Sequence, residues 1–192
     1  MHFKPFDNPY LKMEKTIRQF KEALARCRAI YINKNGDYGP SWRVLRPTTL
    51  TDQLLIKARR IRQVETSKKT AVGEGILPEF HALVNYGIMA LIQLQLGAVV
   101  HKDLDSEGAL RKYDEVSEQT FDLMLKKNTD YGEAWRHMRV SSFTDLILSK
   151  LERIKEIEDN QGKTSVSEGI DSNYFDIINY AIFGIIRLTE AN

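Results

Sequence analysis

The stretch KNGDYGPSWRVLR at residues 34–46 returns as KNTDYGEAWRHMR at residues 127–139, which is 93 residues further along the chain. Both copies contain a Lys-Asn pair, an Asp-Tyr-Gly triplet, a Trp-Arg pair and a final Arg. Self-similarity at a fixed offset indicates that a structural unit has been duplicated. We therefore expect the segments on either side of the two stretches to correspond as well.

Helical periodicity surrounds the first stretch. Apolar side chains recur at the spacing of one helical face over residues 9–33, which predicts a first helix there. Thr49–Asp52 has the layout of a capping box and is expected to open a second helix. A third helix is expected to end at Gly97. It is apolar around most of its girth over residues 83–96, which is typical of a helix at the centre of a bundle.

The second half of the chain repeats this order. Ser142–Asp145 repeats the capping box, and an Asn-Tyr pair recurs on the third helix. Because no segment alternates convincingly as a strand would, the sequence predicts an all-α fold, a tandem duplication of a three-helix unit. Two units are too few for a solenoid, so we expect a pseudo-twofold helical bundle. The expected units are residues 1–100 and 101–192, packed together as one globular body.

Composition narrows the class of protein. The chain has 192 residues, of which 42% are hydrophobic and 28% charged, with a formal net charge of +2. This near-balance argues against a general polyanion-binding surface but leaves room for a local basic patch. Cys27 is the only cysteine, which excludes an internal disulfide and a cysteine-based zinc site. Its place on an apolar helical stripe predicts a buried, inert thiol.

Membrane and export signals are not evident. No apolar run reaches the roughly 18 residues of a membrane span, and the first residues lack the apolar core of a signal peptide. We therefore expect a cytoplasmic protein with no membrane partner.

The repeated stretch itself is expected to form a loop, because its Asn-Gly and Gly-Pro pairs break helices. Asp37 and Tyr38 would then lie in that loop. A structural turn explains the Asp and the Gly. It does not explain a Tyr and a Trp flanked by arginines in both copies, since aromatic faces stack on bases and guanidinium groups pair with phosphates. The structural and the ligand-binding interpretations both stay open.

On the binding interpretation, the stretch supplies cations and rings to a phosphorylated ligand, and basic side chains of the second helix neutralise further phosphate charge. The candidate ligand-binding residues are Lys34, Asp37, Tyr38, Trp42, Arg46, Lys127, Asp130, Tyr131, Trp135, Arg136, Arg139, Lys150 and Arg153.

Carboxylates on the third helix of the second unit are candidates for a magnesium site. Glu168 and Asp171 are three residues apart and share a helix face, and Mg²⁺ usually takes only one or two carboxylates plus substrate phosphates. The helix dipole explains the same two acids equally well. Asp176 follows among apolar neighbours, where a buried carboxylate needs a partner such as Arg153.

The first unit does not keep these acids. Leu77 and Ala82 stand where the second unit has Asp171 and Asp176. If carboxylates hold a metal, one competent metal site per chain is expected. The candidate metal ligands, with one acid from the second helix, are Glu168, Asp171, Asp176 and Asp145.

The pattern K-N-x-D-Y-G-x-x-W-R, followed by an Arg/Lys-rich helix and a D-x-x-N-Y element, resembles the family called nucleotide modification associated domain 1. That family was first described as a domain of unknown function. Both copies match, so the resemblance covers nearly all of the chain. It implies a role near nucleotide or nucleic-acid modification without supplying a reaction.

More distantly, the third helix of the second unit is similar to the E-x-x-D…N helix of the all-α nucleoside triphosphate pyrophosphatases related to MazG and dimeric dUTPases. In those enzymes, Mg²⁺ held by helix carboxylates activates cleavage of a nucleotide to its monophosphate and pyrophosphate. Glu168, Asp171 and Asn179 are the matching positions, which adds Asn179 to the candidate ligand-binding residues. The second helix lacks the paired E-x-x-E of that superfamily, and only Asp145 stands there.

Two hypotheses of different classes follow. One is a nucleotide-binding helical protein that acts as a magnesium-dependent pyrophosphohydrolase. The alternative is a non-catalytic module that binds a nucleotide or nucleic acid, or that partners a modifying enzyme. A homodimer is a further expectation, because bundle faces of this kind often self-associate.

Overall fold

The computed structural model describes residues 9–67, 75–163 and 168–190, and all its regular elements over these ranges are helices. No strand occurs within them, so the predicted all-α fold is confirmed. In chain order the elements are α1 (Pro9–Tyr38), η1 (Ser41–Val44, a 3₁₀-helix), α2 (Pro47–Ser67), α3 (Leu77–Leu96), α4 (Ser106–Tyr131), η2 (Ala134–His137, a 3₁₀-helix), α5 (Val140–Asp159) and α6 (Ile170–Glu190).

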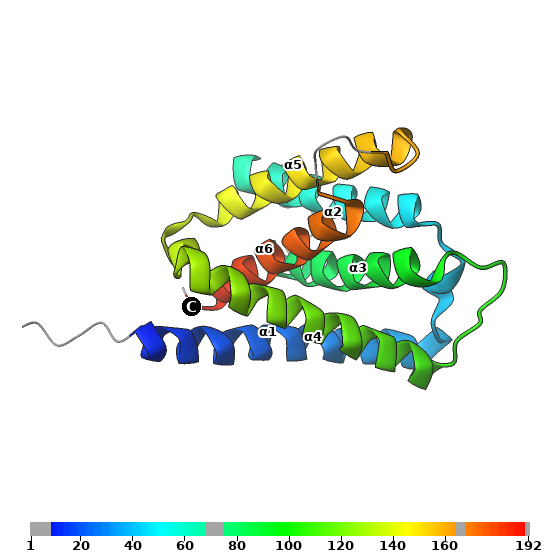
Figure 1. Cartoon of the computed structure of the whole chain (residues 1–192), viewed down its shortest axis with the longest axis horizontal. Coiled ribbons are helices and arrows are strands. Elements are labelled where there is room, and N and C mark those ends of the chain that lie inside the picture. Colours follow the sequence, from blue (N-terminus) through cyan, green and yellow to red (C-terminus); the bar gives the residue numbers. More distant parts are fainter. Residues whose placement is uncertain (1–8, 68–74, 164–167, 191–192) are drawn as a thin grey trace, which may run out of the picture.

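The helices form three layers (Figure 1). The central pair, α3 and α6, lies between α1 with α4 on one side and α2 with α5 on the other. Each helix contacts its counterpart from the other unit, and α1 and α4 also contact the central helix of the opposite unit. The two three-helix units therefore share one core, to which all six helices contribute.

The central helices are apolar because they are covered from both sides. Most side chains of α3 from Phe80 to Gln93 are buried, which confirms the predicted central helix. It ends where the sequence indicates, because Gly97 adopts φ +75° and its N–H bonds to Gln93 O at 2.8 Å. At the crossing of α3 and α6, Gly184 lies so close to the ring of Phe80 that an added Cβ would be 2.6 Å from Cε1.

The loop predicted for the repeated stretch is wrong. The first helix does not stop at its Asn-Gly pair but continues to Tyr38, so Asp37 and Tyr38 belong to the last turn of α1. A tertiary contact holds this turn, since the buried Asn35 donates its amide N–H to Ser106 O at 2.9 Å. The helix then ends at Gly39, which adopts φ +66°. In the second unit α4 likewise runs to Tyr131.

The predicted capping boxes do not cap. Helix α2 already begins at Pro47 and α5 at Val140, so both boxes lie inside their helices. Proline is favoured at a first helical position because its ring fixes a helical φ and it has no N–H to leave unpaired. Asp145, freed from a capping role, pairs instead with Arg62 of α2 at 2.6 Å.

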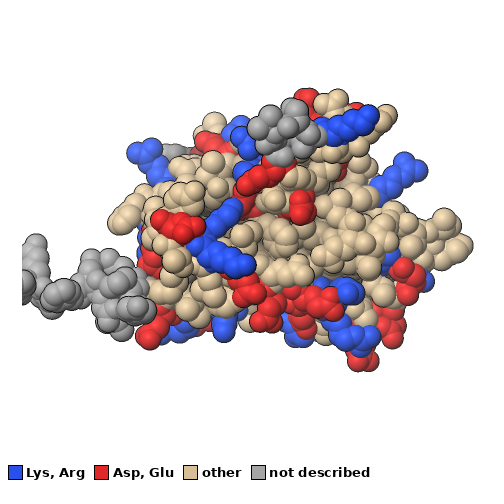
Figure 2. All heavy atoms as spheres, viewed as in Figure 1, with Lys and Arg blue, Asp and Glu red and all other residues tan. Residues whose placement is uncertain are grey.

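Two predictions made from composition, on the single cysteine and on the surface charge, can be compared with the structure. The Cys27 side chain is fully buried, which confirms the predicted burial, and burial raises the pKa of its thiol to about 12. Positive and negative side chains are interspersed on the face shown in Figure 2, as the near-balanced charge indicates. None of the helices in the described part of the chain is long and apolar enough to cross a membrane.

Candidate functional site

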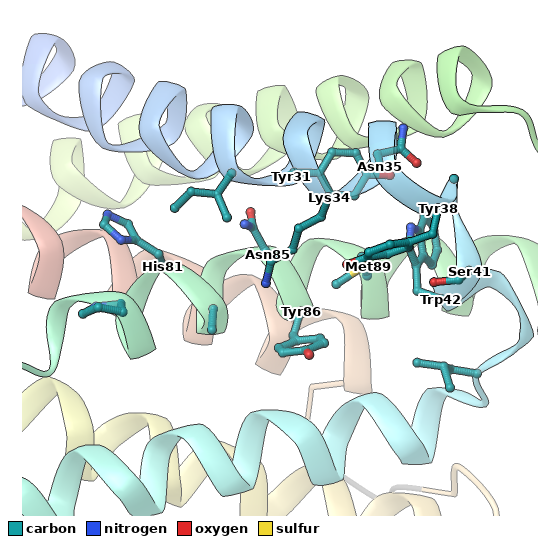
Figure 3. A pocket seen from close by; sticks show the side chains of 15 residues that line it. Tyr31, Lys34, Asn35, Tyr38, Ser41, Trp42, His81, Asn85, Tyr86 and Met89 are labelled. Carbon is teal, nitrogen blue, oxygen red and sulfur yellow. The ribbon is translucent and has the colours of Figure 1, made fainter. Parts of the chain in front are cut away.

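A cavity of about 510 Å³ lies in the first unit, between the end of α1, the turn into η1 and the outer face of α3. We call it the first-repeat cavity. Figure 3 shows the Lys34 side chain reaching from α1 toward Asn85 of α3, with Tyr38 and Trp42 at one end of the row of lining side chains and His81 at the other. Three of the candidate ligand-binding residues, Lys34, Tyr38 and Trp42, therefore line one hollow.

The local fold explains why these three converge. Lys34 and Tyr38 are four residues apart on α1, so they project from the same helix face. The positive φ of Gly39 then reverses the chain, and η1 brings Trp42 back against the cavity. Trp42 is 8% exposed and Tyr38 is 54% exposed, so one ring forms a wall and the other lies at the mouth.

Helix α3 supplies the opposite wall, which sequence reasoning missed. Its lining residues include Ala82, Tyr86 and Met89, which recur at the three- and four-residue spacing of one helix face. The same spacing is also that of a helix face buried in the core, so the sequence does not distinguish a cavity wall from core. His81, also on this wall, has a lowered pKa because it is half-buried and lies near the charge of Arg26.

Asp37 and Arg46, predicted to act with these residues, are exposed and do not line the cavity. The remaining arginine of the stretch, Arg43, is fully buried and holds the fold together. Its guanidinium binds both carboxylate oxygens of Asp103, at 2.8 and 2.9 Å. It also donates to Gly97 O at 2.9 Å and contacts the side chain of Gln93.

The equivalent positions of the second unit are packed against protein. Trp135 stacks on Phe183 with ring centroids 4.4 Å apart and an interplanar angle of 7°. The guanidinium of Arg136 lies over the Trp135 ring and binds Glu133 at 2.8 Å and Gln19 at 2.9 Å. Trp135 and Arg136, both predicted ligand-binding residues, are thus already engaged within the bundle.

The cations predicted to bind phosphate in the second unit meet a carboxylate of the protein. Asp176 is 5% exposed, accepts from Lys150 at 2.7 Å and also pairs with Lys127. The partner predicted for Asp176 was Arg153, and this is wrong. Arg153 is exposed and borders a second cavity of about 870 Å³ between α5 and the start of α6, together with Glu168.

Three further predicted residues of the second unit, Asp130, Tyr131 and Arg139, are exposed around the end of α4 and the start of α5. Asn179 is buried, and its amide has no hydrogen-bond partner among the described residues. The four candidate metal ligands are also dispersed. Glu168 and Asp171 are exposed at the start of α6, whereas Asp176 is bound by lysines and Asp145 by Arg62.

Over the described ranges, no group of three or more His, Cys, Asp or Glu side chains is close enough to hold a metal ion. The four candidate carboxylates do not gather into one cluster of this kind. Magnesium therefore stays a prediction, without support from this arrangement.

A family model described as nucleotide modification associated domain 1 matches residues 34–94 and 127–188, which together are more than half of the chain. The chain belongs to this family. No curated protein and no solved structure matches it. Each nucleotide modification associated domain 1 segment begins at the lysine of the repeated stretch and ends near the end of a central helix. Apart from Ile30 and Tyr31, every lining residue of the first-repeat cavity lies within the first segment.

Asn85, on the cavity wall, is held by two hydrogen bonds that the second unit lacks. Its Oδ1 accepts from the Tyr113 hydroxyl at 2.7 Å, and its amide N–H donates to Cys27 O at 3.1 Å. Tyr113→Phe is expected to lower the free energy of unfolding by about 1–3 kcal/mol, because a buried acceptor loses its donor. Urea denaturation followed by circular dichroism measures the loss.

The duplication offers the matched control. Phe20 of α1 is the counterpart of Tyr113, and Asn179 of α6, whose amide has no hydrogen-bond partner among the described residues, is the counterpart of Asn85. Phe20→Tyr should therefore be neutral or stabilising, since the new hydroxyl can donate to that amide. A Tyr113→Phe variant as stable as the wild type would contradict the assigned role of this bond.

Proposed function

We propose that this protein binds a nucleotide in the first-repeat cavity. The observation that carries the proposal is an unpaired positive charge on the wall of the cavity. Lys34 lines it and makes no ion pair with any residue of the described ranges. Its counterpart Lys127 is neutralised by Asp176. An exposed cation without a carboxylate partner, on the wall of a hollow, favours an anionic ligand.

The remaining walls suit the uncharged part of such a ligand. Tyr38, Trp42 and Tyr86 offer aromatic faces, and Met89 adds an adaptable apolar surface. Stacking of one base on an aromatic side chain contributes about 1–3 kcal/mol and tolerates any base. A volume of about 510 Å³ also lies within the usual range of small-molecule sites. The family description, nucleotide modification associated domain 1, agrees with this ligand class.

Isothermal titration calorimetry with nucleoside monophosphates and the matching nucleosides tests the proposal. Lys34→Gln is expected to weaken nucleotide binding about 10- to 100-fold, because a charge-assisted contact is worth about 1.5–3 kcal/mol. Its effect on nucleoside binding should be small. Lys127→Gln is the matched control and should leave nucleotide affinity unchanged. Equal losses in the two lysine variants would contradict the assignment of the site to the first unit.

Tryptophan fluorescence gives a second readout. Trp42 lines the cavity, whereas Trp135 is stacked on Phe183. In a Trp135→Phe variant, the emission of Trp42 alone should change as a nucleotide is added. If no nucleotide changes this emission or gives a calorimetric signal, the proposed function fails.

A pyrophosphate-release assay distinguishes nucleotide binding alone from catalysis. The protein is incubated with nucleoside triphosphates and Mg²⁺, and released pyrophosphate is measured. Release would assign the pyrophosphohydrolase activity, whereas binding without release would assign the module. The dispersed carboxylates favour the module.

A further inference from the structure

The two units differ at the positions that line the first-repeat cavity. Helix α6 carries an aspartate where α3 has an alanine, and it carries phenylalanines where α3 has a methionine and a histidine. The pairs, first unit then second, are Ala82 and Asp176, Met89 and Phe183, and His81 and Phe175. Asp176 and Phe183 of the second unit are engaged with Lys127 and Trp135, whereas Phe175 borders a smaller hollow of about 390 Å³ between α4 and the start of α6. The second unit therefore places its own side chains where Lys34 and Trp42 of the first unit face open space.

The Asp176 carboxylate pairs with two lysines of the second unit. Asp176 lies between Lys127 of α4 and Lys150 of α5. The counterparts of these lysines in the first unit are Lys34 and Lys57. With Ala82 at that position, Lys34 pairs with no carboxylate of the described part of the chain.

Lys57, the other of these two lysines in the first unit, has a carboxylate partner from a different position of α3. Lys57 pairs with Glu79, at 3.2 Å, and Arg60 contacts the same carboxylate. The second unit has Asn173 in the place of Glu79. One buried acid per unit is thus kept on the central helix, but it lies one helical turn further along in the second unit, and only there does it reach the lysine of the repeated stretch.

We infer that the Asp176 carboxylate is a built-in substitute for the anionic group of the ligand. In the first unit the phosphate of the bound nucleotide takes the equivalent place, beside Ala82 and within reach of Lys34. The chain then has one nucleotide site, located in the first unit. This inference rests on the proposed function, and it adds the position of the phosphate and the reason for a single site.

The decisive variant introduces a carboxylate into the first unit at the position equivalent to Asp176. Ala82→Asp should place a carboxylate against Lys34 and abolish the binding of adenosine monophosphate measured by calorimetry. Ala82→Asn is the matched control, because it adds the same bulk without the charge. We expect Ala82→Asn to retain at least tenfold more affinity than Ala82→Asp. Equal affinities in the two variants would overturn the inference while leaving the proposed function intact.

A second measurement needs no ligand. Lys34→Gln is introduced into the wild type and into the Ala82→Asp variant, and the midpoints of urea unfolding are compared. If the new carboxylate reaches the lysine as Asp176 reaches Lys127, Lys34→Gln should lower the midpoint more in the Ala82→Asp background. Equal shifts in both backgrounds would overturn the inference. Failure of the wild type to bind any nucleotide would instead overturn the proposed function, and the unfolding comparison would still decide the placement of the anion.

Discussion

Replacing Arg43 by alanine is expected to lower the free energy of unfolding by about 2–5 kcal/mol, the range seen when a large, fully buried side chain is shortened to alanine. The guanidinium is fully buried and bridges η1, the end of α3 and the connector before α4. Without it, the fully buried side chain of Gln93 loses a donor, and a buried unpaired group costs about 1–3 kcal/mol. The Asp103 carboxylate, 45% exposed, is solvated instead.

Thermal unfolding monitored by circular dichroism measures this effect. For a chain of this length the midpoint should fall by roughly 10 °C. Arg46→Ala, three residues away on the exposed side, is the matched control and should change stability by less than about 0.5 kcal/mol. A loss below about 1 kcal/mol in Arg43→Ala would show that the arginine does not hold this end of the bundle.

The ion pair between Arg43 and Asp103 also predicts that stability depends on pH. The hydrogen bond from Arg43 lowers the pKa of the Asp103 carboxyl. A carboxyl with a lowered pKa in the folded state stabilises the protein above its ordinary pKa of about 3.9, and this contribution is lost as pH falls through the folded value. The difference in stability between wild type and Arg43→Ala should therefore narrow below about pH 4.

Replacing Gly184 by valine is expected to lower the free energy of unfolding by about 3 kcal/mol, at the upper end of the cost of overpacking a core. The Cβ alone would lie 2.6 Å from Cε1 and 2.9 Å from Cδ1 of Phe80, closer than real Cβ atoms approach their neighbours. The ring cannot move aside easily because Phe80 is fully buried between the two central helices. The valine methyl groups increase the conflict.

Gly36→Val is the matched control, because Gly36 is also helical but an added Cβ there meets nothing within 4 Å. Its effect should stay within about 0.5 kcal/mol. Phe80→Leu should recover part of the loss when it is combined with Gly184→Val, since it removes ring atoms from the crossing. Urea denaturation of the single and double variants measures this coupling. A Gly184→Val variant of wild-type stability would contradict the close approach of α3 and α6.

The candidate site could be predicted in part. Lys34, Tyr38 and Trp42 were singled out by their recurrence, and the structure places all three on one cavity. Their counterparts Lys127 and Trp135 were singled out for the same reason, yet they are bound by Asp176 and Phe183. Recurrence gave both copies equal weight, because it cannot show which side chain of a distant helix lies opposite.

Local sequence patterns were sufficient to predict a duplicated, all-α bundle with α3 at its centre. Apolar side chains that recur every three or four residues share one helix face, and that face must be buried. The role of each polar residue depends instead on which side chains the fold brings next to it. Arg43 holds the fold and Lys34 faces a hollow because the energy of a charged group depends on its partners in space, and those partners lie far away in the chain.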